Sequence, residues 1–576
     1  MDILNHIKDS FLLFDGAMGT MLASGRAPAG LPEVFNIERP EIVTRIHKQY
    51  LEAGADIITA NTFGARANKL KKSGISVQEA VKAGIACARA AGAETVALDV
   101  GPLGELMEPM GAITFEEAYG LFKEEIIAGR DYGADLILLE TFFDPLEAKT
   151  AILAAKENSS LPVFCTMTFQ QGGRTFIGTD PKTAVITLQA LGADAFGVNC
   201  SQGPETLLDV VQEILKYAKR PVIVQPNAGA PRIMDGQTVY DIDINEFVSA
   251  MEKMVSQGVR IIGGCCGTTP DYIAALRGML RGRTVKPIQP LIISAATSAV
   301  KTVELDGHIT VIGERLNPTC NKAVEETLRE NQTDGLADEA IDQAQAGADL
   351  LDINVGLPDI DQADMMRRAV KAVAGAVNLP LLIDSADPAV LEAGARVYGG
   401  RPVINSVNGT EEAMNKIFPI VKKYGAMVVC LTFGDGTGRD KEDIPVTAQR
   451  RFEIARKILA RALEYGIPKE DIIIDCLALP AGAYPAQAAE TLDAVRMVKA
   501  LGLKTALGIS NVSFGAGLGG QPGLRRETLN AAFVSAALAA GLDAPILNPL
   551  SGPVMDAVNA MRALNNGCAW SVLRHV

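Results

Sequence analysis

The sequence has few cysteines and no long hydrophobic run. Its nine cysteines in 576 residues are odd in number and scattered, apart from one adjacent pair. This pattern excludes a disulfide scaffold and indicates reduced thiols in an intracellular protein. No apolar run reaches the roughly 18 residues that a membrane span needs, and the N-terminus lacks the features of a signal peptide. We therefore expect a cytoplasmic protein without a membrane partner.

Positive charge is also in deficit. Lys and Arg total 54 against 68 Asp and Glu, which gives a net charge of −14. So acidic a chain is a poor match for the phosphate backbone of nucleic acids. The apolar share of 48% is ordinary for a globular protein and excludes a disordered or fibrous chain. The length allows two large domains as well as four small ones.

Short apolar runs alternate with longer helical segments along the whole chain, which is typical of a parallel sheet covered by helices. We count eight runs in the first half and eight more from Thr310 onward. This predicts an α/β fold with two consecutive (β/α)8 TIM barrels, at 1–280 and 309–576, joined by a linker at 281–308. A set of smaller doubly wound domains is the alternative. The runs lie at 11–14, 57–60, 95–100, 136–140, 163–169, 195–199, 222–225, 260–264, 310–313, 350–354, 381–384, 403–405, 427–433, 472–475, 505–509 and 545–548.

Many of these runs end in polar residues. Active sites of such barrels lie at the C-terminal ends of the strands, so these residues are catalytic candidates. In the first half they include Asp15, Thr62, Asp99, Glu140, Asn199, Cys200, Asn227, Cys265 and Cys266. In the second half they include Glu314, Asp352, Asn354, Asp384, Asn405, Asp475 and Asn511. We therefore expect one site at the rim of each barrel.

Three cysteines close the sixth and eighth runs of the first half. Cys200 ends one run, and Cys265 and Cys266 end the other. Strands six and eight flank strand seven, so the three sulfurs can converge. Catalytic zinc accepts thiolates and keeps three protein ligands with one open position. The pattern predicts a zinc site, with buried free thiols and redox-active cysteines as alternatives.

Three thiolates around Zn²⁺ leave a net negative charge, which favours activation of an incoming thiol over polarisation of water. A small amino-acid thiol also needs acceptors for its ammonium group and N–H donors for its carboxylate. Glu140 and Asp15 can supply the acceptors. The glycine-rich turn from Gly16 to Thr20 can supply the donors.

The first half resembles the homocysteine S-methyltransferase family across residues 1–280. The resemblance implies zinc on Cys200, Cys265 and Cys266, with the homocysteine sulfur as the activated ligand. It also implies that Asp15, Gly16, Thr62 and Glu140 bind the amino-acid moiety, and that Asn227 fills the open metal position before substrate arrives. The motifs are Asp15-Gly16-Ala17-Met18-Gly19-Thr20, Asn61-Thr62-Phe63, Gly197-Val198-Asn199-Cys200 and Gly263-Gly264-Cys265-Cys266-Gly267.

The second half has no convergent cysteines or histidines. It carries instead a ring of carboxylates and carboxamides, formed by Asp384, Asn405, Asp475 and Asn511. Such a ring suits a flat heterocycle rich in donors and acceptors, because carboxylates accept paired N–H groups and Asn offers both functions. Capping of the helices that follow the strands is the alternative.

Residues 310–564 resemble the pterin-binding barrels, most of all the methyltetrahydrofolate–corrinoid methyltransferases. The motifs are Gly313-Glu314-Arg315-Leu316-Asn317-Pro318, Asp352-Ile353-Asn354, Leu382-Ile383-Asp384-Ser385, Ile404-Asn405-Ser406 and the segment Gly508 to Gly515. The resemblance implies that Asn511 lies near N5 and Arg526 near the anionic tail of the folate. The implied folate-binding set is Glu314, Asp352, Asn354, Asp384, Asn405, Asp475, Asn511 and Arg526.

The order of the two barrels resembles the N-terminal half of the cobalamin-dependent methionine synthase family. This implies methyl transfer from 5-methyltetrahydrofolate, via a corrinoid, to zinc-activated homocysteine. The corrinoid signature Asp-x-His-x-x-Gly is matched only by Asp306-Gly307-His308, with Val311 in place of its Gly. We therefore expect methylcobalamin on an absent module or a separate protein. A thiol methyltransferase with another donor and a non-catalytic zinc- and folate-binding scaffold are the alternatives.

Overall fold

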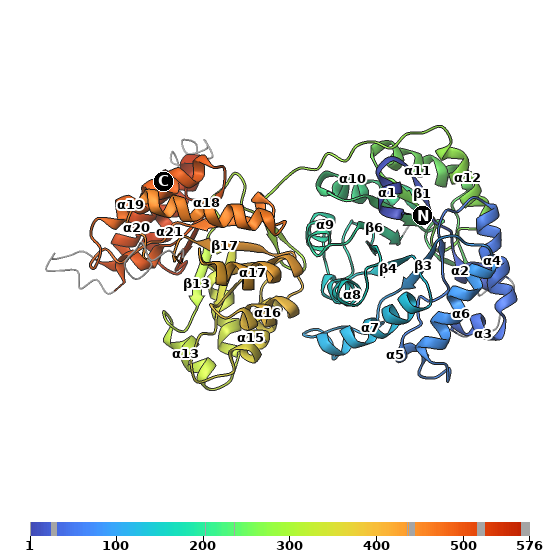
Figure 1. The fold of residues 1–576 in the computed structure, drawn as a ribbon, viewed down its shortest axis with the longest axis horizontal. Coiled ribbons are helices and arrows are strands. Elements are labelled where there is room, and N and C mark those ends of the chain that lie inside the picture. Colours follow the sequence, from blue (N-terminus) through green and yellow to red (C-terminus); the bar gives the residue numbers. More distant parts are fainter. Residues whose placement is uncertain are drawn as a thin grey trace. The chain divides into compact units, whose positions relative to one another are not determined.

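The computed structural model describes residues 2–24, 31–201, 203–234, 237–434, 436, 444–514 and 525–565. The chain divides into two compact units, Met1–Leu291 and Ile292–Val576. Each unit contains eight parallel strands wrapped by helices (Figure 1). The predicted fold of two (β/α)8 barrels is thereby confirmed. In the described ranges, no helix is both long and apolar enough to cross a membrane.

In the first unit, the strand order of the sheet is β1-β10-β7-β6-β5-β4-β3-β2. A parallel bridge between Phe14 and Ile57 joins the two outer strands and closes the ring. The strands are β1 (Leu12–Leu13), β2 (Ile58–Thr59), β3 (Val96–Val100), β4 (Leu136–Phe142), β5 (Val163–Met167), β6 (Ala195–Cys200), β7 (Val222–Pro226) and β10 (Ile261–Ile262). Each of the eight predicted runs of this half therefore overlaps one strand.

Helices cover the outside of the first barrel, and side chains fill its inside, so the parallel sheet is buried on both faces. They are α1 (Ile3–Asp9), α2 (Met18–Ser24), α3 (Phe35–Glu38), α4 (Pro40–Glu52), α5 (Ala67–Leu70), α6 (Val77–Ala90), α7 (Phe115–Asp131), α8 (Pro145–Asn158), α9 (Pro181–Ala190), α10 (Leu208–Tyr217), α11 (Ile244–Gln257) and α12 (Pro270–Leu280), with short 3₁₀ turns at Pro32–Val34 and Pro204–Leu207. Inside, Ile3 and Ile7 join Leu12, Phe14 and Phe164 in the buried core.

Two features of the first barrel bear directly on its rim. The antiparallel hairpin β8 (Arg232–Met234) and β9 (Gln237–Val239) follows β7 and was not predicted. Gly197 in β6 allows close approach of β7, because an added Cβ would lie 1.8 Å from the Ile223 carbonyl oxygen. The glycine before the Val198-Asn199-Cys200 segment thus has a packing reason.

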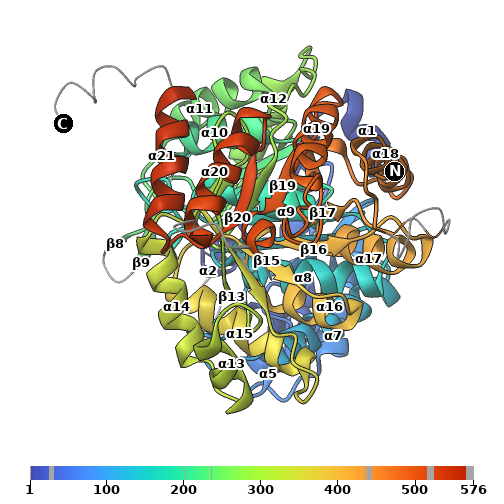
Figure 2. The same cartoon turned by 90° about the vertical axis from the view of Figure 1, so that its left-hand side faces the viewer.

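The second unit is a closed barrel with its strands in chain order, β13 to β20 (Figure 2). The strands are β13 (Ile312–Leu316), β14 (Leu350–Asn354), β15 (Leu381–Asp384), β16 (Val403–Val407), β17 (Met427–Leu431), β18 (Ile472–Asp475), β19 (Lys504–Gly508) and β20 (Ala544–Leu547). The helices are α13 (Lys322–Arg329), α14 (Asp334–Gln345), α15 (Gln362–Ala376), α16 (Pro388–Val397), α17 (Glu411–Lys423), α18 (Ala448–Glu464), α19 (Gln487–Ala500), α20 (Arg526–Ala539) and α21 (Gly552–Asn565), with 3₁₀ turns η4 (Lys469–Asp471) and η5 (Ile509–Ser513).

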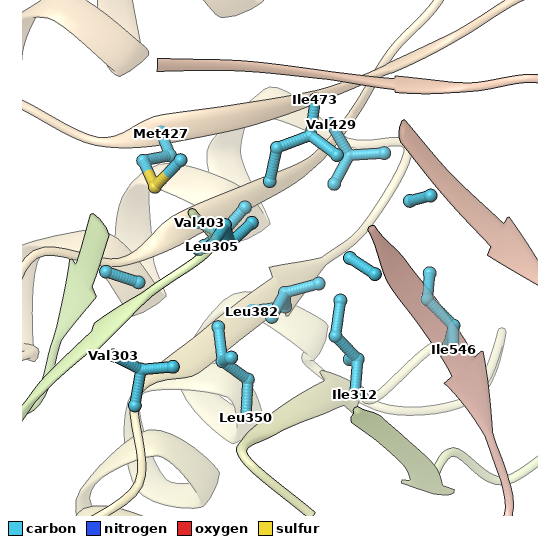
Figure 3. Close-up of a cluster of buried hydrophobic side chains, with 13 residues drawn as sticks. Val303, Leu305, Ile312, Leu350, Leu382, Val403, Met427, Val429, Ile473 and Ile546 are labelled. Carbon is cyan, nitrogen blue, oxygen red and sulfur yellow. The ribbon is translucent and has the colours of Figure 1, made fainter. Parts of the chain in front are cut away.

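Part of the predicted linker belongs to the second barrel. Residues from Ile292 onward fall in the second unit, and they form an antiparallel hairpin of β11 (Ala295–Thr297) and β12 (Thr302–Glu304). Val303 and Leu305 pack with residues of the barrel strands in one buried cluster (Figure 3). The Arg401 guanidinium donates to the Ala295 carbonyl at 3.1 Å and fixes the hairpin. Ala295 and Ala296 of β11 are fully buried.

Candidate metal centre and two rim cavities

Three sulfur atoms converge at the rim of the first barrel. The Sγ atoms of Cys200, Cys265 and Cys266 lie within 4.8 Å of one another. Cys200 ends β6, and the adjacent pair follows β10, on either side of β7. Cys200 and Ser201 both adopt left-handed backbone conformations, with φ of 58° and 65°. Such strain in two successive non-glycine residues is typical of a functional site.

The electrostatics of this cluster suit a soft cation. Hydrogen bonds with the Cys200 and Cys265 thiols lower the pKa of Cys266, whereas the pKa of Cys265 is raised by its hydrogen bonds with the other two cysteines. The Tyr240 hydroxyl also hydrogen-bonds to Cys266, and burial raises the pKa of Tyr240, which keeps its proton. Three convergent thiol groups without histidine form a ligand set that zinc accepts.

A fourth polar atom near this rim lacks a partner. The Oδ1 atom of Asn227 is buried and accepts no hydrogen bond from the described residues. Its amide nitrogen donates to the Ser201 carbonyl at 3.3 Å, which sets the direction of the side chain. A buried, unpaired carboxamide oxygen is costly unless something binds it. This oxygen is therefore available to bind a further group such as a metal ion, although Asn227 does not line the cavity beside the three sulfurs.

A cavity of about 330 Å³ lies beside the three sulfurs. Its lining includes all three cysteines together with Asp15, Gly16 and the turn to Thr20, Asp99, Glu140 and Gln225. Six of the residues assigned to this site from the sequence thus line one cavity: Asp15, Gly16, Glu140, Cys200, Cys265 and Cys266. An added Cβ at Gly16 would meet the Thr268 hydroxyl at 2.7 Å, so the turn needs glycine there.

Asp15 and Glu140, two carboxyl groups of this cavity, differ in their hydrogen bonding. Asp15 accepts hydrogen bonds from the Thr59 N–H at 2.9 Å and the Thr59 hydroxyl at 2.7 Å. Glu140 has no hydrogen-bond partner within the described part of the chain. Burial raises the pKa of Asp15 to about 7. Burial, followed by the charges of Cys266 and Asp15, raises the pKa of Glu140 to about 8. Both groups would ionise more readily beside a bound cation.

Thr62 takes a different place from the one expected. Its fully buried hydroxyl donates to the Asp99 carbonyl at 2.9 Å and accepts from the Asp99 N–H at 3.0 Å. The side chain thus braces the end of β3 and does not line the cavity. Asp99 itself lines the cavity, and burial together with Glu140 raises its pKa. Asp99 ends a predicted strand, so that signal was present in the sequence.

Gln225, Asn199 and Tyr240 also lie near the cluster or the cavity. Asn199 was a strand-end candidate without an assigned role, and the other two were not predicted. The Oε1 atom of Gln225 is buried without a partner among the described residues. Asn199 precedes Cys200 in its motif, which is a usable signal. Tyr240 follows the unpredicted hairpin, and its ring packs against Gly267, where an added Cβ would lie 2.4 Å from the ring. No pattern in the sequence pointed to it.

The second barrel has a larger rim cavity of about 710 Å³. Seven of the eight residues assigned to the second site line it: Glu314, Asp352, Asp384, Asn405, Asp475, Asn511 and Arg526. Asn354 lies beside a neighbouring cavity of about 660 Å³ and donates to the Asp384 carboxylate at 2.9 Å. The structure therefore places Asn354 as a support of Asp384.

The second cavity is lined by one buried carboxyl group, Asp352, and three half-buried ones, Glu314, Asp384 and Asp475. Asn405 donates to Asp352 at 3.1 Å, and the Leu477 N–H donates to Asp475 at 2.7 Å. Burial raises the pKa of Asp384 and of Asp475 to about 6, and that of Glu314 to about 7. Burial and the charge of Asp384 raise the pKa of Asp352 further, so Asp384 and Asp475 are the carboxyls that ionise most readily at neutral pH. The amide groups of Asn405 and Asn511 also line the cavity.

Comparison with protein families gives one match for each barrel. Residues 12–280 match the family described as homocysteine S-methyltransferase. Residues 313–548 match the family described as pterin binding enzyme. The two matches follow one another in the order expected from the sequence motifs.

Curated relatives extend across both barrels. A methionine synthase of Mycobacterium tuberculosis is 31% identical over 586 aligned residues, covering 95% of this chain and 48% of the relative. A methionine synthase of Mycobacterium leprae is 30% identical, with coverage of 95% and 48%. This chain thus spans about half the length of these curated relatives.

Similar solved structures each cover about half of this chain. The metallated form of the homocysteine methyltransferase MmuM from Escherichia coli is 24% identical, with a TM-score of 0.41, and covers 47% of this chain and 96% of its own. Dihydropteroate synthase from Stenotrophomonas maltophilia is 20% identical, with a TM-score of 0.36, and covers 47% and 98%.

Proposed function

We propose that this chain, which resembles the N-terminal half of methionine synthases in sequence and domain order, performs two linked methyl transfers. The second barrel would pass the methyl group of 5-methyltetrahydrofolate to a corrinoid, and the first would pass it from the corrinoid to homocysteine. The products would be tetrahydrofolate and methionine. The convergence of three sulfurs within 4.8 Å, beside a cavity with a free carboxylate, carries the proposal.

In the first barrel, Cys200, Cys265 and Cys266 would hold zinc, with Asn227 as a further ligand before substrate binds. When bound, zinc supplies a site that lowers the pKa of a substrate thiol and keeps it as a nucleophilic thiolate. The unpaired Glu140 carboxylate would receive the ammonium group. The backbone N–H groups of the turn from Gly16 to Thr20 would receive the carboxylate. These contacts orient the sulfur toward the cysteine cluster.

In the second barrel, the carboxylates of Asp384 and Asp475 would accept N–H groups of the pterin, and Asn405 would pair with its mixed edge. The tertiary amine at N5 is a poor leaving group, so it must gain a proton or hydrogen bond before the methyl group departs. Asn511, at the cavity rim on η5, would stabilise the protonated form. Arg526 would contact the anionic tail of the folate.

The proposal is tested by assaying the two half-reactions separately with free corrinoids. We expect methyl transfer from 5-methyltetrahydrofolate to cob(I)alamin, and from methylcobalamin to homocysteine. Removal of metal with a chelator should abolish only methyl transfer from methylcobalamin to homocysteine, and zinc should restore it. Methyl transfer from 5-methyltetrahydrofolate should persist, because the described residues of the second barrel contain no such ligand cluster. Retention of homocysteine methylation in the metal-free protein would contradict the zinc proposal.

We also expect folate binding to weaken at acid pH. The pKa of Asp384 and of Asp475 is raised to about 6, so both carboxyls gain protons as the pH falls through 6 and lose their capacity to accept pterin N–H groups. Calorimetric titration with tetrahydrofolate between about pH 5 and pH 8 should show affinity falling by about tenfold per pH unit below the midpoint, for each required ionised group. Unchanged affinity across this range would show that neither carboxylate pairs with the ligand.

A further inference from the structure

One buried side chain links the free carboxylate of the first cavity to the cysteine cluster. Asn199, at the end of β6, is fully buried. Its Oδ1 atom accepts from the Thr141 N–H at 2.8 Å and from the Thr166 hydroxyl at 2.8 Å. Its Nδ2 atom donates to the Thr141 hydroxyl at 2.7 Å and to the Cys265 sulfur at 3.9 Å. The amide thus uses its hydrogen-bonding capacity on two functional segments at once.

The segment that Asn199 holds is under strain. Thr141 adopts a left-handed backbone conformation, with φ of 67°, and a β-branched residue rarely does so. The pairing of β4 with β5 shifts register between Leu139 and Phe142, so Glu140 and Thr141 form an irregularity at the end of β4. A strained residue of this kind persists only when its surroundings hold it in place. The two hydrogen bonds between Asn199 and Thr141, to the Thr141 N–H and the Thr141 hydroxyl, provide that restraint.

The consequence concerns Glu140, the residue before Thr141. Its carboxylate lines the cavity and has no hydrogen-bond partner among the residues that the structure describes. Its position therefore depends on the backbone of the irregular segment, because no side-chain hydrogen bond from the described residues fixes it. Cys265, the other residue that Asn199 contacts, belongs to the cysteine cluster. A carboxylate that binds one end of a small molecule and a sulfur that would hold the metal for its other end need a constant separation.

We propose that Asn199 is a positioning residue that fixes the separation between the Glu140 carboxylate and the Cys265 sulfur, and so makes the first barrel selective for thiols that carry an amino group. The inference rests on the proposed function of this cavity. Loss of the Asn199 amide frees the Glu140–Thr141 segment to relax, and the ammonium contact weakens. The bond between the substrate sulfur and the metal does not depend on that contact.

The test compares two thiols that differ only in the amino group, homocysteine and 4-mercaptobutanoate. Each is titrated into the full chain loaded with cobalt(II), and the sulfur-to-cobalt absorption band reports binding without any turnover. In the natural protein we expect homocysteine to bind more tightly. In Asn199→Ala we expect the ratio of the two affinities to fall by about 10- to 100-fold, the usual effect of losing a hydrogen bond to a charged group.

Three further variants separate positioning from a general structural role. Asn199→Asp keeps the acceptor for the Thr141 N–H but loses the Nδ2 donor and adds charge beside Cys265. Both thiols should therefore bind more weakly, and their ratio should fall by less than in Asn199→Ala. Thr141→Val, at a half-exposed position, removes only the hydroxyl partner and should lower the ratio by a smaller factor. Thr166→Val removes a contact of Asn199 away from Glu140 and should leave the ratio unchanged.

The outcomes are distinguishable. If Asn199→Ala and Thr141→Val weaken both thiols by the same factor, or leave the ratio unchanged, Asn199 does not set selectivity and the inference fails. If the natural protein binds neither thiol through cobalt, the proposed function of the first barrel fails, and this inference fails with it. Cobalt content measured for each variant identifies a change in metal binding as the cause of a lost signal.

Discussion

Replacing Cys265 with alanine is expected to abolish zinc binding and to lower methyl transfer from methylcobalamin to homocysteine by at least about a thousandfold. Two sulfurs and one carboxamide would remain, and they are too few and too weak to retain the metal against competing ligands. Methyl transfer from 5-methyltetrahydrofolate to cob(I)alamin should be unchanged, because the second barrel is a separate compact unit with its own core.

The measurement is metal content by elemental analysis together with both half-reactions. Cys87→Ala is the matched control, since Cys87 is a buried thiol of the same barrel outside the cluster and hydrogen-bonds to the backbone carbonyls of Asn36 and Pro40 and to the Thr44 side chain. That control should keep its zinc and its activity. If Cys265→Ala loses zinc yet still methylates homocysteine, the metal is structural, and the scaffold alternative gains support.

The rim residues were predictable because barrel geometry turns a local pattern into a spatial one. A run of apolar residues that ends in a polar residue marks a buried strand whose last side chain reaches the rim. For β14, β15 and β18, the predicted bounds are those observed. Their terminal residues Asp384 and Asp475 accordingly line the second cavity. The same rule brought Cys200 and Cys265 together across β7 from segments more than sixty residues apart.

Side-chain direction at the strand ends was less predictable, because it depends on how each chain leaves its strand. Thr62 and Asn354 both follow the strand-end rule, yet each turns away from the main cavity and braces a neighbouring carboxylate segment. A single turn or a shift of register decides between the two directions, and no short motif encodes that choice. The sequence therefore identified the right segments more reliably than the contacts of single residues.

Residues contributed by short hairpins escaped prediction altogether. Strands β8, β9, β11 and β12 contain three residues each, which is too few for a visible alternation of polar and apolar side chains. The position of Tyr240 follows from the β8–β9 hairpin that precedes it. The β11–β12 hairpin places Val303 in a buried cluster with residues of the second barrel's strands. Both are set by tertiary packing, Tyr240 against Gly267 and Val303 against the barrel strands, and such contacts leave no local pattern.

Replacing Asp475 with asparagine is expected to lower methyl transfer from 5-methyltetrahydrofolate to cob(I)alamin by about a hundredfold or more. One Asp475 oxygen accepts the Leu477 N–H at 2.7 Å, and Leu477 has a left-handed backbone, with φ of 61°. This bond aims the carboxylate, and the second oxygen is left for a ligand in the cavity. Asparagine keeps the first interaction through its carbonyl oxygen but presents an NH₂ group where the pterin N–H needs an acceptor.

This change separates binding geometry from folding, because the substitution preserves the size of the side chain and its bond to Leu477. Zinc content and transfer from methylcobalamin to homocysteine should stay at natural levels, so the Asp475→Asn and Cys265→Ala proteins would have reciprocal defects. If the two variants are mixed with free cob(I)alamin under reducing, anaerobic conditions, 5-methyltetrahydrofolate and homocysteine, methionine should form, since each supplies the half-reaction that the other lacks. Failure of the mixture, with each intact half-reaction present, would mean that both barrels must act within one chain. In that case, the corrinoid would have to pass between the two rims without release.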